Sequence, residues 1–227
     1  MGDSQAQENI YLFYPNLIGF ARIFLALGAF WFAEVDPFAT FWLYALSCFL
    51  DAFDGLAARH FDQSTLLGAA LDMLTDRCAT TLMLVQLACM YGAQLGRREI
   101  TFTFQCLIAL DIVSHWMVML VTSITGAKSH KDQNQPLLRL YYYKPILFTM
   151  CAANDGFFVC LYMLWFSEGI EVPYTDGMGL YRVLLYACAP LCVLKQLLNV
   201  IQLLQATSDL AAIDLKRRAD ARALKKN

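Results

Sequence analysis

The fold of this chain is decided by Asp51-Ala-Phe-Asp54-Gly55-Leu-Ala-Ala58-Arg59 and, after eight further residues, by Gly68-Ala-Ala-Leu-Asp72-Met-Leu-Thr-Asp76. Both stretches are compatible with helix and, apart from these charges, mostly apolar. The members of the first acidic pair are three residues apart and those of the second are four apart. Each pair therefore lies on one face of its helix, with a rise of roughly 4.5 to 6 Å between its members.

Four carboxylates in apolar sequence need a compensating charge. In a low-dielectric environment the repulsion is relieved by protonation, by arginine or by bound divalent cations. Carboxylate oxygens suit magnesium or manganese better than zinc. A metal site formed by Asp51, Asp54, Asp72 and Asp76 is therefore the leading hypothesis.

Two other interpretations of the acidic residues stay open at this point. One is a buried salt-bridge network with Arg22, Arg59 and Arg77. The other is an ion-conducting path, because acids inside a membrane also mark transporters. Neither interpretation explains why small residues stand between the acids.

The composition predicts a membrane protein. Of 227 residues, 59% are hydrophobic and 16% are charged, which leaves too little polar surface for a soluble domain of this size. The net charge of -2 gives no reason to expect nucleic acid as a partner. The eight cysteines lie in apolar stretches without a Cys-x-x-Cys pair, as expected of buried packing residues.

The chain is predicted to be an all-α, polytopic membrane protein with six transmembrane helices. Spanning a bilayer takes about 20 mostly apolar residues, and six segments qualify: 12–33, 38–59, 66–92, 100–124, 143–167 and 178–206. We expect three parts: an N-terminal interfacial segment over 1–11, a six-helix catalytic domain over 12–206 and a cytosolic basic tail over 207–227. The tail has apolar residues at helical spacing from Ser208, which fit a cytosolic or surface-lying helix. Ser64 or Thr65 is a candidate N-cap of the third helix.

Basic residues gather in the connection 126–144 and in the tail, so the positive-inside rule places both termini in the cytosol. Arg97 and Arg98 do not fit this orientation, because they lie in a connection that it places on the opposite side of the membrane. Asp51 and Asp54 close the second segment, whereas Asp72 and Asp76 open the third. Antiparallel neighbours would therefore bring all four acids to the same, cytosolic, depth.

The pattern Asp-x-x-Asp-Gly-x-x-Ala-Arg-x8-Gly-x3-Asp-x3-Asp resembles, position for position, the signature of the CDP-alcohol phosphotransferases, which are membrane enzymes of phospholipid synthesis. Nearly the whole chain is similar to the eukaryotic phosphatidylinositol synthases within that family. The similarity extends to Pro15-Asn16-Leu-Ile-Gly19-Phe-Ala-Arg22, Asp111-Ile-Val-Ser114-His115-Trp116 and Ser129-His130-Lys131.

This resemblance implies the CDP-alcohol phosphotransferase fold and a homodimer. It also implies that the protein lies in the endoplasmic reticulum membrane, in contact with membrane lipids. The implied reaction transfers a phosphatidyl group from CDP-diacylglycerol to myo-inositol and releases CMP. The acids would hold two divalent ions, Mg²⁺ or Mn²⁺, and Asp76 would also be the catalytic base.

The expected CDP-diacylglycerol site has six residues: Asn16, Arg22, Gly55, Ala58, Arg59 and Gly68. A nucleotide that approaches a helix closely needs small residues such as Gly55 and Ala58. Arg59 could form two parallel hydrogen bonds with diphosphate oxygens. Asn16 and Arg22 could instead tie a helix end to lipid headgroups.

The expected acceptor cavity has four residues: Asp111, Ser114, His115 and Lys131. A single histidine in an apolar helix is more often a packing residue, and Lys131 also fits a solvated basic loop. Glycerol phosphate, serine or diacylglycerol are alternative acceptors, although no dedicated basic pair stands beside the motif for a phosphorylated one. A divalent-cation transporter is the alternative from another class.

Overall fold

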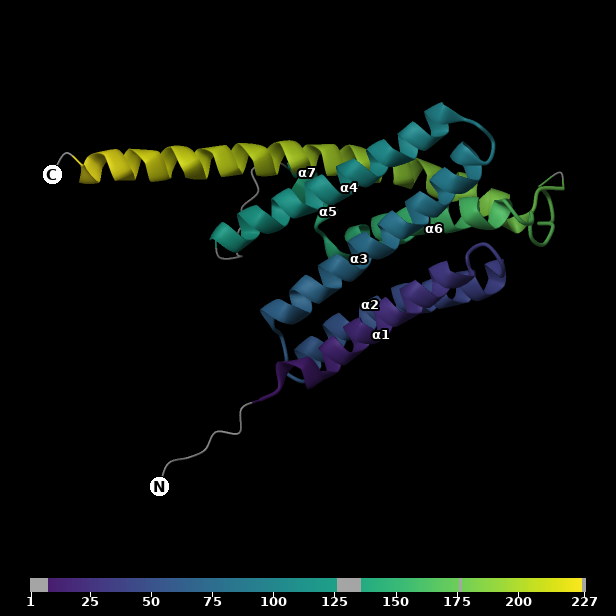
Figure 1. Cartoon of the computed structure of the whole chain (residues 1–227), viewed down its shortest axis with the longest axis horizontal. Helices are drawn as coiled ribbons and strands as arrows, with labels where there is room; N and C mark the ends of the chain where they lie inside the picture. The colour runs from purple at the N-terminus through teal and green to yellow at the C-terminus, as the bar shows by residue number, and fades with distance from the viewer. Residues whose placement is uncertain (1–7, 126–135, 176, 226–227) are drawn as a thin grey trace, which may run out of the picture. The chain divides into compact units, whose positions relative to one another are not determined.

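Helices account for most of the chain in the computed structural model, which describes residues 8–125, 136–175 and 177–225. Within those ranges no strand is formed beyond an isolated bridge between Glu171 and Gly179. The all-α prediction is confirmed. The elements in chain order (Figure 1) are the 3₁₀ helix η1 (Ile10–Leu12), α1 (Tyr14–Phe32), α2 (Pro37–His60), α3 (Leu66–Leu87), the π-helical turn η2 (Ala88–Ala93), α4 (Arg98–Thr125), α5 (Pro136–Tyr141), α6 (Lys144–Leu164) and α7 (Leu180–Leu224).

Five of these helices are long and apolar enough to cross a membrane: α1, α2, α4, α6 and α7. Large apolar side chains such as Phe24, Trp31 and Trp42 point outward from them, as expected of a surface that faces lipid. Helix α3 has 22 residues, enough to span, but it carries Asp72, Asp76 and Arg77. The chain is a multi-pass membrane protein.

Three details differ from the sequence-based expectation. Helix α7 runs unbroken through residue 206 to Leu224, so the tail expected from 207 continues the last helix. The reason is local, because no glycine or proline follows Pro190 before Leu224 and strong helix formers fill the stretch. In addition, α3 passes into the π-helical turn η2, and the connection after α4 contains the short helix α5.

The chain divides into two compact units, one ending at Gln86 and the other beginning at Leu87. The expectation of one catalytic domain over 12–206 stays a prediction.

In the first unit, α1 and α2 pack as a hairpin through small and hydroxyl residues. Thr40 Oγ1 donates to the carbonyl of Ala29 at 3.0 Å, and Ser47 Oγ donates to that of Arg22 at 3.0 Å. Thr65 Oγ1 accepts the N–H of Gly68 at 3.0 Å at the start of α3. Thr65 is therefore the N-cap, which confirms one of the two predicted candidates, whereas Ser64 Oγ faces the carbonyl of Ala58.

In the second unit, α6 and α4 each pack against α7. Leu138, Tyr141, Met150 and Leu198 form a buried apolar cluster where α5, α6 and α7 meet. In the connection before α7, Arg182 donates to Glu168 and holds the pKa of that carboxyl below its usual value.

The sequence expectation for 1–11 falls partly on residues 1–7, which lie outside the described residues.

The cap of α2 gives a stability prediction. Asp36 accepts the N–H groups of Phe38 and Ala39, each at 3.0 Å, at the start of the helix. Asp36→Ala should lower the free energy of unfolding by about 1 kcal/mol, because these N–H groups lose their acceptor. Asp36→Asn keeps a side-chain acceptor and should stay close to the parent. Denaturant unfolding in detergent measures both, and equal losses in the two variants would contradict the capping role.

Candidate functional site

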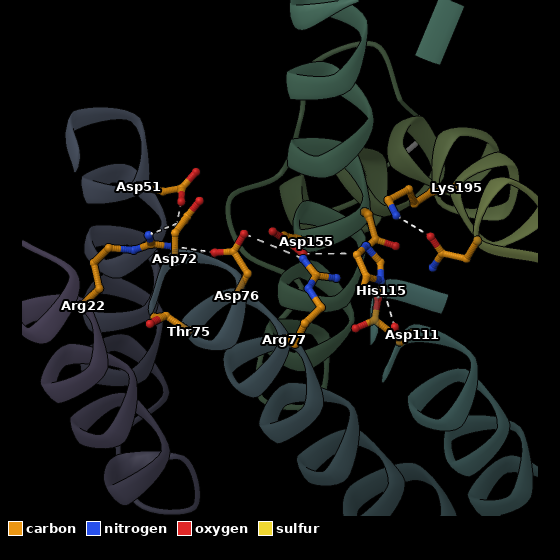
Figure 2. A network of polar contacts seen from close by, with 12 residues as sticks. Arg22, Asp51, Asp72, Thr75, Asp76, Arg77, Asp111, His115, Asp155 and Lys195 are labelled. Atoms are coloured by element: carbon orange, nitrogen blue, oxygen red, sulfur yellow. Dashed lines mark hydrogen bonds and ion pairs between the residues drawn. The ribbon is translucent and has the colours of Figure 1, made fainter. Parts of the chain in front are cut away.

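The structure brings carboxylates from α2 and α3 together at the cluster shown in Figure 2. One carboxylate oxygen from each of Asp51, Asp72 and Asp76 lies within 4.8 Å of the others. Their side chains are 44%, 48% and 35% exposed, so a cation from solvent can reach them. Three hard oxygen donors at this separation fit Mg²⁺ or Mn²⁺.

The fourth acid, Asp54, lies deeper than the other three, with a side chain 10% exposed. Arg22 Nη1 donates to Asp54 Oδ2 at 2.6 Å. This contact connects Asp54 to the same cluster, since Nη1 also donates to Asp72.

Arg22 lies at the centre of the acids. Its Nη1 is 2.6 Å from Asp54 and 3.0 Å from Asp72, and its Nη2 is 2.7 Å from Asp51 and 2.5 Å from Asp76. The side chain is 2% exposed. Part of the salt-bridge network that the sequence left open is therefore present, whereas a contact of Arg22 with CDP-diacylglycerol stays a prediction.

Of the other two arginines of that network, Arg77 pairs with the edge of the cluster and Arg59 points away along α2. Arg77 Nη2 is 3.8 Å from Asp76 Oδ2, at the edge of the cluster. Arg59 is exposed, and its guanidinium folds back along α2. A Cβ atom at Gly55 would lie 3.4 Å from Arg59 Nη1.

A cavity of about 160 Å³ lies beside the acids within the first unit. For comparison, a cavity of about 150 Å³ is enough to hold a benzene ring. Asp54 and Asp72 contribute to its wall, so the cavity is continuous with the acidic cluster. It is lined by Pro15, Gly19, Asp54, Gly55, Ala58, Gln63, Ser64, Thr65, Gly68, Ala69, Leu71 and Asp72.

The small residues that the sequence analysis selected all border this cavity. Gly55 and Ala58 line it from α2 and Gly68 from α3. Their small size keeps the cavity close to the helix backbones, and the Arg59 and Asn16 side chains lie next to Gly55 and Gly68.

Asn16 stands behind the cavity wall at Gly68. Its side chain is buried, and its Nδ2 donates to the carbonyl of Ile10 at 2.7 Å. Among the described residues Asn16 Oδ1 has no hydrogen-bond partner. Leaving a buried acceptor unpaired costs about 1–3 kcal/mol, and Asn16 does not itself line the cavity.

The predicted acceptor residues lie in the second unit, on α4. Asp111 and Ser114 are buried, and His115 is partly exposed. His115 Nδ1 is 2.8 Å from the carbonyl of Asp111 and 3.2 Å from Ser114 Oγ. The three side chains thus form one local group, whereas Lys131 lies outside the described residues.

The sequence analysis missed a group of buried polar residues where α6 packs against α7. Gln196 Nε2 donates to Asn154 Oδ1 at 2.9 Å, and Lys195 Nζ donates to Asn199 Oδ1 at 2.5 Å. Gln202 Nε2 donates to the hydroxyl of Tyr142 at 2.8 Å. A signal was present, because positions 195, 199 and 202 recur at helical spacing within an apolar segment.

A model of the CDP-alcohol phosphatidyltransferase family matches residues 12–194. The chain belongs to this family. The match covers both units, and it confirms the resemblance that the acidic motif indicated. As a member of the family, whose enzymes depend on metal, the chain has in its carboxylate cluster a group able to bind a metal ion.

Curated relatives are similar along almost their whole length. The chain is 45% identical to a Drosophila melanogaster protein, in an alignment that covers 95% of this chain and 92% of the relative. It is also 45% identical to a Homo sapiens protein, with 93% of this chain and 97% of the relative covered. It is 40% identical to a Schizosaccharomyces pombe protein over 98% of each. All three relatives are named CDP-diacylglycerol–inositol 3-phosphatidyltransferase. No solved structure matches significantly.

Two helical glycines give a prediction about the cavity wall. An added Cβ at Gly68 would lie 2.9 Å from Asn16 Oδ1, whereas one at Gly28 meets Leu43 Cδ1 at an ordinary 3.6 Å. Gly28→Ala should therefore stabilise the protein by up to about 1 kcal/mol through helix propensity, whereas Gly68→Ala should give no gain or a loss. Thermal unfolding in detergent compares the two, and an equal gain at both positions would contradict the packing described.

Proposed function

We propose that this chain is a phosphatidylinositol synthase, which transfers a phosphatidyl group from CDP-diacylglycerol to myo-inositol and releases CMP. One observation carries this proposal: curated relatives of that activity are 40–45% identical over more than nine-tenths of the chain. The carboxylate cluster and the adjoining cavity support the reaction class.

The cavity is suited to the cytidine part of CDP-diacylglycerol. Gly55, Ala58 and Gly68 bring the cavity close to the helix backbones, and we also assign Asn16, which stands behind Gly68, to this substrate. The guanidinium of Arg59, which lies over Gly55, can form paired hydrogen bonds with diphosphate oxygens. Arg22 is the sixth residue that we assign to this substrate.

Asp51, Asp54, Asp72 and Asp76 would hold the divalent cations, which we propose to be two Mg²⁺ or Mn²⁺ ions. When bound, such ions neutralise charge that develops on the diphosphate. The three clustered carboxylates support this assignment, and Asp54 joins them through Arg22.

Asp76 would act as the base. A hydroxyl oxygen of inositol forms a bond to the phosphatidyl phosphorus, and its proton passes to the Asp76 carboxylate. The phosphorus–oxygen bond to CMP breaks, and CMP leaves with the electron pair. The Asp76 side chain is 35% exposed, so its carboxylate is accessible to a hydroxyl group.

We further assign the acceptor site to Asp111, Ser114, His115 and Lys131. A neutral polyol needs both donors and acceptors of hydrogen bonds, and the first three residues provide them on one helix. We place the enzyme in the endoplasmic reticulum membrane as a homodimer, with both termini and the active site cytosolic.

A panel of acceptors tests the proposed function. Purified protein in nanodiscs is mixed with CDP-diacylglycerol, Mn²⁺ and one of inositol, glycerol 3-phosphate, serine or no acceptor, and CMP release is measured. We expect release only with inositol, and only with both lipid and metal present. Release with another acceptor would contradict inositol as substrate. Metal flux into proteoliposomes without CDP-lipid would support the transporter instead.

The small residues of the cavity give a binding prediction. Gly55→Leu and Ala58→Leu should abolish CDP-diacylglycerol binding, because either side chain fills the space beside the helix. Ala52→Leu is the matched control, since Ala52 lies exposed on the same helix. Binding is measured by calorimetry on protein that elutes as a folded species. Normal binding by both cavity variants would place the nucleotide elsewhere.

Asp76→Asn separates chemistry from binding. The amide keeps an oxygen for a metal but cannot accept the proton, so turnover should fall by about 10²–10⁴-fold while CDP-diacylglycerol affinity falls far less. Affinity and single-turnover rate are measured on one preparation at saturating metal. A parallel collapse of the two, or a rate near the parent's, would rule out Asp76 as the base.

A further inference from the structure

The arrangement of Arg22 among the carboxylates carries an inference beyond its assignment to the substrate. Each terminal nitrogen contacts one acid of α2 and one of α3: Nη1 bridges Asp54 and Asp72, and Nη2 bridges Asp51 and Asp76. Figure 2 shows Arg22 beside Asp51, Asp72 and Asp76. One guanidinium therefore occupies the space that all four acids share.

A divalent cation would share its carboxylates with Arg22. Asp51, Asp72 and Asp76, which form the candidate cation group, each give an oxygen to the guanidinium at 2.5–3.0 Å. A divalent cation on these three carboxylates would lie close to the guanidinium, and two positive groups at such a separation repel each other, the more so because the Arg22 side chain is only 2% exposed. Cation binding and the full set of Arg22 contacts therefore oppose each other.

The surroundings of Arg22 allow it to give up those contacts. Asp54 and Asp72, the partners of Nη1, both line the cavity, so open space adjoins two of the four carboxylates that hold the guanidinium. Arg22 Nε, in addition, is buried without a hydrogen-bond partner in the part of the chain that the structure describes. The guanidinium is thus strongly bound through Nη1 and Nη2 but has no hydrogen-bond partner at Nε in the described residues.

We propose that Arg22 is an internal counter-cation that competes with the divalent cation for the four carboxylates. In the metal-free protein it stabilises the acidic cluster, and cation binding requires it to withdraw. This inference rests on the metal site of the proposed function. It differs from a merely structural role, in which Arg22 would hold the carboxylates in position and help the cation to bind.

Linkage between the two cations supplies the test. Mn²⁺ binding is titrated by the EPR signal of free Mn²⁺, without CDP-diacylglycerol, on the parent, Arg22→Gln and Arg22→Lys. Arg22→Gln should bind Mn²⁺ about 5–150-fold more tightly than the parent, the ordinary range of such coupling. Its melting temperature should fall in chelator and should rise more than the parent's when Mn²⁺ is added.

Arg77→Gln is the matched control, because it removes a positive charge at the edge of the cluster, 3.8 Å from Asp76. It should change Mn²⁺ affinity much less than Arg22→Gln. Arg22→Lys keeps the charge but offers a single ammonium group in place of the planar fork. It should bind Mn²⁺ with intermediate affinity, and it tests the inference if Arg22→Gln does not fold.

Equal or weaker Mn²⁺ binding by the folded Arg22 variants would overturn the competition. If the parent still releases CMP with inositol, that result leaves the proposed function intact. A parent that binds no Mn²⁺ would overturn the proposed metal site together with this inference.

Discussion

Repulsion among four carboxylates in an apolar chain is the constraint on which the rest of this structure depends. Asp51 on α2 lies close to Asp72 and Asp76 on α3, with one oxygen of each within 4.8 Å of the others, and Asp54 joins them through a shared arginine. Arg22 supplies one positive charge from α1. Three helices are thereby tied together by charge, and the cluster still carries more negative than positive groups at its centre.

The cavity follows from the same arrangement. Asp54 and Asp72 belong both to the acidic cluster and to the cavity wall, so a ligand in the cavity adjoins the charges. Gly55 and Gly68 bring the cavity close to the helix backbones, and Thr65, which also lines the cavity, caps the N-terminus of α3. A nucleotide diphosphate matches this combination, because its ring needs space and its phosphates need nearby cations.

Local patterns made much of this predictable from the sequence. The spacing of the acids placed each pair on one helical face, and hydrophobic length located the helices to within a few residues. The contacts of Arg22 were harder to foresee, since three arginines were candidates and only tertiary packing selects among them. The spacing of apolar residues from Ser208 indicated a helical tail, but its continuity with the last membrane segment was not predicted, because the positive charges suggested a separate part.

We infer that the carboxylates of α2 and α3 form a cation site. Anomalous scattering from crystals of the protein grown with Mn²⁺ and CDP-diacylglycerol tests this most directly. Mn²⁺ peaks are expected bonded to oxygens of Asp51, Asp72 and Asp76, with the Arg22 guanidinium withdrawn from them. Well-ordered crystals with no Mn²⁺ peak at these oxygens, and with Arg22 still bridging all four acids, would contradict it.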